Sequence, residues 1–322
     1  PEAVAGLRVL GFCDWYSPLA SGGAERAAWE VYRRLGAAGA DLVVVSAAHG
    51  PPHDDPGVAV DVVRGIDLSS VVGGYLAPAP GAFLAGRRRM ATHRPDVIHV
   101  NTIHYTGCVA GARLAARHDV PLVVTAQLGS LDHLPGAARR LAAAYERLVG
   151  GYILRRASSV LAVSESAGAH AVALGARADA VTLAPNGVDH DRFAMAPLVA
   201  GDEPLILTVG RLTGNKGPDL VLEAAGRLAR DGRRFRLAFV GDGPLREPLE
   251  KRARALAIAD RVEFPGQVGD VERWVARAEI VVRASYTEGL PLAVLEAMAA
   301  GRCNVVSDIP PNRELIVDGE TG

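Results

Sequence analysis

The stretch PLILTVGRLTGNKGPDLVLEAAGRL, residues 204–228, decides the fold of the second half of the chain. It opens on an apolar run rich in β-branched side chains, which predicts a buried strand. A loop containing Gly214 and Gly217 follows, and a helix is expected to begin where that loop ends. A buried strand that leads directly into a helix is typical of a parallel α/β sheet.

The same alternation continues in both directions from this stretch. The predicted strands after it are FRLAFVG, RVEFPG, EIVVRAS and CNVVSD, and those before it are LRVLGFC, DLVVVSA, DVIHV, PLVVTA, SSVLAVS and AVTLAP. Helical segments separate them, and the clearest covers residues 137–156. There Leu141, Tyr145, Leu148 and Tyr152 fall on one helical face.

The domain organisation follows from the place where this alternation is interrupted. Residues 193–204 contain two prolines and few large apolar groups, which predicts a linker. We therefore expect an N-terminal Rossmann-like domain over residues 1–192 and a C-terminal one over residues 205–322. Both would be doubly wound parallel α/β sheets facing a cleft, with ligands at the carboxyl ends of their strands.

Composition excludes several classes of protein. The 322 residues include 35 basic and 36 acidic side chains, so the positive field of a nucleic-acid binder is not expected. Cys13, Cys108 and Cys303 lie far apart and predict neither a disulfide framework nor a zinc site. No apolar run is long enough to cross a membrane and no signal peptide is evident, so a cytoplasmic location is expected.

The loop after residue 210 carries the first candidate binding site. Arg211 leaves the strand, and Lys216, one of only two lysines in the chain, stands beside the start of the next helix. The N–H groups at a helix start attract phosphate, and two cations that converge there suit a diphosphate. The alternative is a turn with solvated charges.

The first domain offers weaker candidates. Gly22 and Gly23 separate its first strand from its first helix, where residues without side chains let a ligand approach the backbone. His99 lies on a buried strand and is interpreted as a core residue, whereas His104 lies just beyond that strand. No clustered set of metal ligands is present, so no metal site is expected.

The segment SYTEGLPLAVLEAMAAG, residues 285–301, contains two glutamates around a predicted helix start at Pro291. Glu288 precedes the helix and Glu296 lies in its second turn. An acid near a helix N-terminus gains about 0.3–1 kcal/mol from the helix dipole. That gain explains one glutamate but not the pair, so we expect the two acids to contact different parts of a ligand.

The motifs, taken together, resemble those of the retaining glycosyltransferases of family 4, which use nucleotide-sugar donors and have the two-domain GT-B fold. They occur in the order SGGAER, PDVIHV, SSVLAVSES, LAPNGVD, TVGRLTGNKG, FVGDGPLREPLE, RVEFPGQV and EGLPLAVLEAMAAG, over nearly the whole chain. The resemblance implies that Arg211 and Lys216 bind the donor diphosphate. It implies that Glu296 holds the ribose hydroxyls of the nucleotide.

The same resemblance assigns roles to further residues. Glu288, with the backbone of Gly289 and Leu290, matches the group that contacts the donor sugar and its phosphate. Gly22 and Gly23 match the loop that closes over the donor.

The base of the nucleotide would be held by main chain around Gln267 and Val268. For catalysis we predict His104 and Glu288, with His104 facing Glu288 across the cleft when the domains close. Asn101 and His133 are the rival positions to His104, since relatives carry histidine near both.

This chain departs from the family pattern at several points. Asn101 and Gln127 stand where relatives often have histidine, and Pro311 replaces a glycine close to the donor. The sequence given ends at Gly322, before the final helices that family members normally have.

The expected function is a metal-independent, retaining hexosyltransferase that needs no cofactor and uses a UDP- or GDP-linked sugar as substrate. The acceptor class stays open among saccharides, lipid-linked molecules and small metabolites, and no nucleic acid is expected as a partner. Two alternatives remain. One is a GT-B-like nucleotide-sugar epimerase, and the other is a sugar-nucleotide-binding protein with altered catalytic residues.

A weak peripheral membrane contact is a further expectation. Basic residues recur in GRRRMATHR, residues 86–94, and at Arg139, Arg140, Arg147, Arg155 and Arg156. They would form a basic surface on the first domain, although solvated helix faces explain the same residues.

Overall fold

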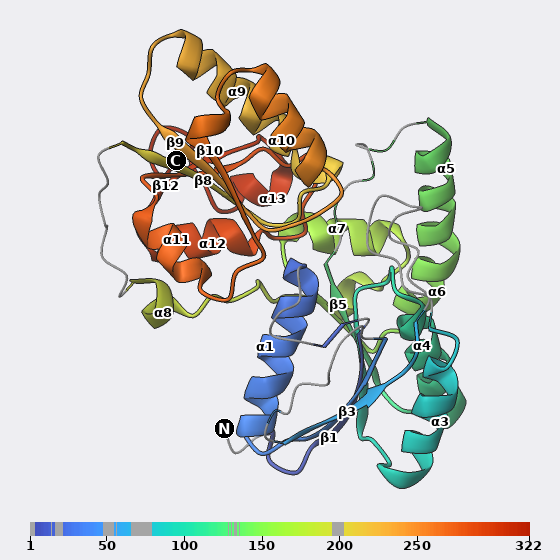
Figure 1. Ribbon diagram of the computed structural model, residues 1–322. Coiled ribbons are helices and arrows are strands. Elements are labelled where there is room, and N and C mark those ends of the chain that lie inside the picture. The colour runs from blue at the N-terminus through green and yellow to red at the C-terminus, as the bar shows by residue number, and fades with distance from the viewer. Residues whose placement is uncertain are drawn as a thin grey trace. The chain divides into compact units, whose positions relative to one another are not determined.

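The computed structural model describes residues 4–13, 15–16, 22–47, 55, 57–65, 79–127, 129, 131, 134, 136–194 and 203–322. The chain forms two compact units, residues 1–185 and 186–322. Each unit is built around one parallel sheet with helices on both faces (Figure 1). The prediction of two doubly wound α/β domains is therefore confirmed in its fold class.

The first unit contains a seven-stranded sheet in the order β3-β2-β1-β4-β5-β6-β7. Every pair of neighbouring strands is parallel. The strands are β1 (Arg8–Cys13), β2 (Asp41–Ser46), β3 (Val58–Val62), β4 (Val97–Asn101), β5 (Leu122–Ala126), β6 (Ser159–Ala162) and β7 (Val181–Leu183).

Helices lie against both faces of this sheet. They are α1 (Gly23–Ala37), α3 (Ala82–Thr92), α4 (Thr106–His118), α5 (Gly136–Tyr145), α6 (Gly151–Leu154) and α7 (Glu165–Ala173). Helix α1 covers one face, and α3 and α4 cover the other (Figure 1). Glycines bring α3 and α4 close to the sheet, because a Cβ on Gly86 or Gly111 would lie 2.7 or 2.8 Å from the ring of Phe12.

The second unit contains a five-stranded parallel sheet in the order β10-β9-β8-β11-β12. Its strands are β8 (Leu205–Val209), β9 (Arg236–Val240), β10 (Val262–Gly266), β11 (Ile280–Arg283) and β12 (Cys303–Val306). Its helices are α8 (His190–Ala194), α9 (Pro218–Arg230), α10 (Arg246–Ala255), α11 (Val271–Arg277), α12 (Leu292–Ala299) and α13 (Pro310–Arg313). Separate apolar clusters line the two faces, one under α9 and α10 and one under α8, α11 and α12.

Three features differ from the sequence prediction. Strand β3 and helix α3 were not expected, because the Pro- and Gly-rich stretch around them gives no clear periodicity. Helix α12 begins at Leu292, so Pro291 precedes it. The second unit begins at Asn186, before the predicted boundary at residue 192, and Phe193, which was predicted to lie in the linker, belongs to the core of the second unit. Most of the predicted linker, residues 195–202, lies outside the described residues.

The predicted helix over residues 137–156 forms, but not with the expected buried face. A π-helical turn, Glu146–Gly150, interrupts it between α5 and α6. Leu141 and Leu148 are 74% and 71% exposed. The residues that turn inward are Glu146, Gly150, Ile153 and Leu154.

The strand order places one switch point in each sheet. The chain leaves β1 toward β2 and β3 and returns on the other side at β4. In the second unit it leaves β8 toward β9 and β10 and returns at β11. Ligands of open α/β sheets bind outside the carboxyl ends of the strands at such points. Ligand-binding residues of both units are therefore expected in the loops after β1, β4, β8 and β11.

Candidate functional site

The loops after β8 and β11 are clamped together in the second unit. Gly217 ends the first loop with φ +60°, and a Cβ there would lie 2.1 Å from the carbonyl oxygen of Ala284. The backbone N–H of Tyr286 donates to the carbonyl of Asn215 at 2.9 Å. Only glycine allows this close approach, so the sequence of the first loop sets its distance from the second.

Glu288 forms the centre of this junction. Its side chain is 7% exposed and accepts a hydrogen bond from Lys216 Nζ at 2.7 Å. The other carboxylate oxygen accepts from Arg283 Nε at 2.8 Å and from Ser285 Oγ at 2.7 Å. Arg283 also donates to the carbonyl of Val209, the last residue of β8, at 2.6 Å. One buried carboxylate thus fixes two buried cations at the switch point.

The protonation states follow from this arrangement. Burial alone would raise the pKa of Glu288, but the charges of Arg283 and Lys216 outweigh burial and lower it to about 2. Burial lowers the pKa of Lys216 to about 8, although the charge of Glu288 acts in the opposite direction. The carboxylate therefore stays ionised at neutral pH, and Lys216 is cationic up to about pH 8.

Arg211 adds a third cation on the β8 side of the junction. Its side chain is half-buried, and its charge contributes to lowering the pKa of Lys216. Among the described residues, no hydrogen-bond acceptor is found for its guanidinium group. Two helices, α9 and α12, begin beside this junction with their N–H groups at the same edge of the sheet. A polyanion with several oxygens matches this combination of cations and helix starts.

The remaining predicted donor residues lie in the second unit along the same sheet edge. Glu296 is in the second turn of α12 and is 3% exposed. Leu290 is buried, and its carbonyl accepts from Asn186 Nδ2 at 3.3 Å. Gln267 and Val268 follow β10, two strands from β8, which corresponds to roughly 10 Å.

The sequence analysis did not identify Arg283 or Ser285 as site residues, although both contact Glu288 directly. Arg283 is the last residue of β11 and is 7% exposed. An arginine that ends an otherwise apolar strand, EIVVRAS, was the signal that could have identified it.

In the first unit, Gly22 and Gly23 lie at the start of α1, as predicted. Gly22 precedes the helix, and a Cβ there would lie 1.8 Å from Oε2 of Glu25. The two amides that stand where relatives often have histidine are also found here. Asn101 Nδ2 donates to the carbonyl of Ala24 at 3.1 Å, and Gln127 donates to Asn101 Oδ1 at 3.1 Å. These amides tie the ends of β4 and β5 to α1.

The two histidines after and on β4 behave differently. His99 contacts the Tyr32 hydroxyl at 2.5 Å and the Thr125 hydroxyl at 2.8 Å, and burial lowers its pKa to about 4. The interpretation of His99 as a satisfied core residue is confirmed. His104 Nε2 lies 2.8 Å from Oε1 of Glu146, which the sequence did not predict as a partner. The rival His133 lies outside the described residues.

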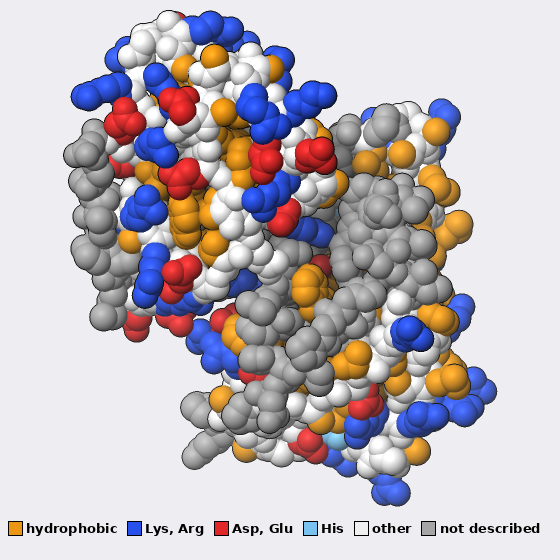
Figure 2. Space-filling model, viewed as in Figure 1, with side chains coloured by type: hydrophobic (Ala, Val, Ile, Leu, Met, Phe, Trp, Pro, Cys, Tyr) orange, Lys and Arg blue, Asp and Glu red, His pale blue; other side chains and the backbone are white. Residues whose placement is uncertain are grey.

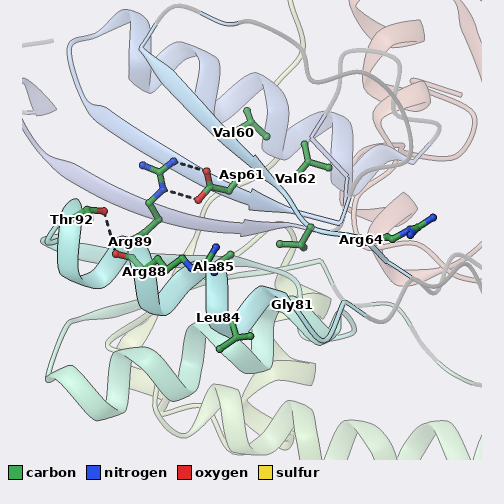
Figure 3. Close-up of a pocket in the computed structure, with 11 residues that line it drawn as sticks. Val60, Asp61, Val62, Arg64, Gly81, Leu84, Ala85, Arg88, Arg89 and Thr92 are labelled. Atoms are coloured by element: carbon green, nitrogen blue, oxygen red, sulfur yellow. Dashed lines mark hydrogen bonds and ion pairs between the residues drawn. The ribbon is translucent and has the colours of Figure 1, made fainter.

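A groove with a volume of about 690 Å³ lies between β3 and α3, at the edge of the first sheet far from the β1–β4 switch point (Figure 3). In it Arg89 forms two hydrogen bonds with Asp61, at 2.6 and 2.5 Å. Arg64 extends away from this pair (Figure 3). The groove therefore contains part of the predicted basic segment 86–94, but the charge of Arg89 in that segment is already neutralised by Asp61.

Charge on the visible surface is mixed. Figure 2 shows basic and acidic side chains interspersed on the second unit. Within the part of the chain that the structure describes, no group of three or more His, Cys, Asp or Glu side chains is arranged to hold a metal ion. Searching those same residues finds no helix with the length and apolar character needed to traverse a bilayer.

Known proteins resemble this chain over both units. Residues 21–192 match the family model described as Glycosyltransferase Family 4, and residues 191–322 match the model described as Glycosyl transferases group 1. D-inositol 3-phosphate glycosyltransferase 2 of Catenulispora acidiphila is 32% identical over 330 residues, covering 91% of this chain and 75% of that protein. Alpha-D-kanosaminyltransferase of Streptomyces kanamyceticus is 37% identical over 123 residues, which are 38% of this chain and 32% of that protein.

A solved structure shows the same fold. Anabaena HepE in complex with UDP-glucose superposes with a TM-score of 0.74 at 20% identity, covering 97% of this chain and 84% of that one.

Proposed function

Because the chain belongs to the group 1 glycosyltransferases and has the GT-B fold, we propose that it transfers a hexose from a nucleotide-diphosphate sugar to an acceptor hydroxyl. We further propose that the anomeric configuration of the sugar is retained and that no metal ion takes part. The observation that carries this proposal is the junction of Lys216, Arg211 and Arg283 at the β8–β11 switch point.

The cations of this junction would stabilise the leaving group. Breaking the bond between the sugar and the diphosphate moves negative charge onto the phosphate oxygens. Fixed cations and helix N–H groups aimed at that charge stabilise the transition state more than the ground state. Lys216 and Arg211 would supply this stabilisation, which a bound metal ion supplies in other transferases.

Glu288 has two possible contributions at this junction. The resemblance implies that it contacts the donor sugar. In the structure both carboxylate oxygens already accept hydrogen bonds, from Lys216, Arg283 and Ser285. We therefore propose that Glu288 first positions the cations, and that the backbone of Gly289 and Leu290 makes the direct contacts with the donor. Glu296 would hold the ribose.

The donor is proposed to be UDP- or GDP-linked. The UDP-glucose bound by HepE, a protein of the same fold, supports the UDP-linked donor. The acceptor class stays open, because the relatives include both a glycogen synthase and a D-inositol 3-phosphate glycosyltransferase. Two alternatives differ in chemistry. A nucleotide-sugar epimerase would change the donor without an acceptor, and a binding protein would leave it unchanged.

A thermal-shift panel tests the binding half of the proposal. A ligand that binds only the folded state raises stability by about 2.7 kcal/mol at a concentration of 100 Kd. UDP or GDP should raise the unfolding midpoint in the presence of EDTA, and Lys216→Ala should reduce this shift to about half or less. Binding that requires a divalent ion would contradict metal independence, and no shift with any nucleoside diphosphate would contradict the proposed donor.

A further inference from the structure

The free edge of the first sheet carries unpaired backbone groups. Within the described part of the chain, the edge strand β3 pairs with β2 alone. The carbonyl of Gly57 accepts from the β2 side at 3.4 Å, and the N–H of Val63 donates to that side at 2.8 Å. Residues two apart in a strand direct these groups to the same side, so the odd-numbered residues of β3 face β2. The N–H and C=O groups of Val60 and Val62 therefore point to the free edge.

A local turn uses one outward position of this edge and leaves the next two. Val58 donates to the carbonyl of Asp55 at 3.1 Å, which forms an isolated antiparallel bridge at the start of β3. Among the residues that the structure describes, no partner is found for the outward groups of Val60 and Val62. An edge with unpaired donors and acceptors is a template on which another strand can pair.

The groove between β3 and α3 lies along this edge (Figure 3). Consecutive residues 60–64 line it, so the groove reaches the edge of the strand as well as one of its faces. Two of its apolar side chains are exposed, Val62 at 44% and Leu84 at 53%. The other wall is one face of α3, made by Gly81, Leu84, Ala85, Arg88, Arg89 and Thr92.

The groove carries an excess of positive charge. Among the residues that line it, Asp61 is the one carboxylate, against Arg64, Arg88 and Arg89. Asp61 and Arg89 neutralise each other through hydrogen bonds of 2.5 and 2.6 Å. Arg64 and Arg88 are exposed, and neither guanidinium group has an acceptor within the described ranges. Carboxylates are the side chains that match guanidinium groups best, so the groove is complementary to an acidic ligand.

We propose that this groove binds an extended, acidic peptide segment of a partner protein, which adds as a strand to β3. The backbone of the segment pairs with Val60 and Val62, at the usual strand spacing of about 4.8 Å. Its acidic side chains reach Arg64 and Arg88. In this mode of recognition the main-chain hydrogen bonds provide affinity and the side chains provide specificity. The proposal does not depend on the transferase function, because the groove lies away from the β1–β4 switch point.

Two other occupants fit the groove less well. A second copy of the chain would bring the same excess of arginine to this edge, and like charges across an interface repel. A lipid bilayer would attract the arginines, but its hydrocarbon offers no partners to the edge groups of Val60 and Val62. An acidic peptide supplies both the carboxylates and the backbone partners.

Fluorescence anisotropy with the whole chain tests the charge part of the proposal. The probe is a labelled synthetic peptide in which glutamate and valine alternate, and the control peptide has lysine in place of glutamate. The glutamate peptide should bind with a Kd of about 1 mM or lower, and the lysine peptide should not bind. Arg88→Gln should weaken binding about tenfold. Arg117→Gln, at an exposed arginine near the end of α4 and outside the groove, is the matched control.

N-methylation of the peptide separates strand addition from binding by side chains alone. Methylating every second amide blocks the donors on one side of an extended strand, so two patterns block opposite sides. One pattern should weaken binding about tenfold or more, and the other should keep it. On the protein, Val60→Pro removes an N–H that β2 does not use, a change that edge strands tolerate. Val60→Pro should lose binding and Val60→Ala should keep it, with similar thermal midpoints.

The contrary results are distinct. Equal weakening by both methylation patterns would show binding without strand addition, and equal binding of the lysine peptide would remove the acidic preference. No binding of the glutamate peptide at 1 mM would overturn the proposal. Association with anionic vesicles that Arg88→Gln abolishes, without peptide binding, would assign the groove to a membrane. If Val60→Pro does not fold, the two methylated peptides decide the question with the wild-type chain.

Discussion

Replacing Glu288 with glutamine tests the description of the β8–β11 junction. The substitution keeps the shape of the side chain but removes the negative charge that pairs with Lys216 and with Arg283. Their side chains are 15% and 8% exposed, so water cannot replace the carboxylate well. Removing one partner of a buried ion pair costs about 3–5 kcal/mol. Lys216, whose pKa is already about 8, can lose its proton, so we expect a loss of about 3 kcal/mol.

The loss should be measured for the second unit alone. Trp274 is the one tryptophan in that unit, so its fluorescence during urea unfolding can be followed in a Trp15→Phe, Trp29→Phe background. Glu223→Gln is the matched control, because Glu223 forms an exposed ion pair with Arg252 and should leave the midpoint unchanged. The destabilisation of Glu288→Gln should shrink as pH rises toward about 8, where Lys216 loses its proton in the wild type as well. A midpoint like that of the control would refute the account of a buried, charge-fixing carboxylate.

Three further predictions concern binding. The affinity for UDP or GDP should fall as pH rises above about 8, because only the cationic form of Lys216 attracts the diphosphate and the pKa of Lys216 in the free protein is about 8. Measured by calorimetry, Lys216→Arg should remove this pH dependence. Lys216→Ala should weaken binding by about 1.5–3 kcal/mol at pH 7. A flat profile in the wild type would be the contrary result. Glu296→Ala should weaken UDP more than inorganic pyrophosphate, since its proposed partner is the ribose, and an equal loss for both ligands would contradict that role. Sedimentation with anionic vesicles at low salt should show at most weak association through segment 86–94, because Arg89 is paired with Asp61; strong association would show that this surface is an effective membrane contact.

The strands of both sheets could be predicted because parallel strands buried on two faces are short apolar runs. Strand β3 was missed for the opposite reason. It lies at the edge of the sheet, its residues are largely half-exposed or exposed, and its sequence VAVDV is less apolar than the central strands. An edge strand needs no continuous apolar run, so hydrophobic periodicity gives little indication of it.

The cations of the donor junction were predicted from one loop, but their shared counter-charge was not. The sequence suggested that Lys216 and Glu288 contact different parts of a ligand, whereas the structure pairs them at 2.7 Å. This contact joins residues far apart in the chain, and it depends on Gly217 lying against the β11 loop. Spacing along the sequence does not reveal such a contact.

Glu146 was missed because the helical period changes at that residue. A regular helix over residues 137–156 would turn Leu141 and Leu148 to one face and give Glu146 no special place. The π-helical turn shifts the phase, so Glu146 turns inward and the leucines turn outward. A period of 3.6 residues cannot anticipate that shift.

Release of nucleoside diphosphate from UDP- and GDP-linked hexoses, with proton NMR of the sugar product, tests the central claim most directly. The account predicts that one donor is consumed in the presence of EDTA, that Lys216→Ala abolishes its consumption, and that the product keeps the anomeric configuration of the donor. Consumption that requires a metal ion, a product of inverted configuration, or conversion of the donor to an epimer without release of nucleoside diphosphate would contradict it.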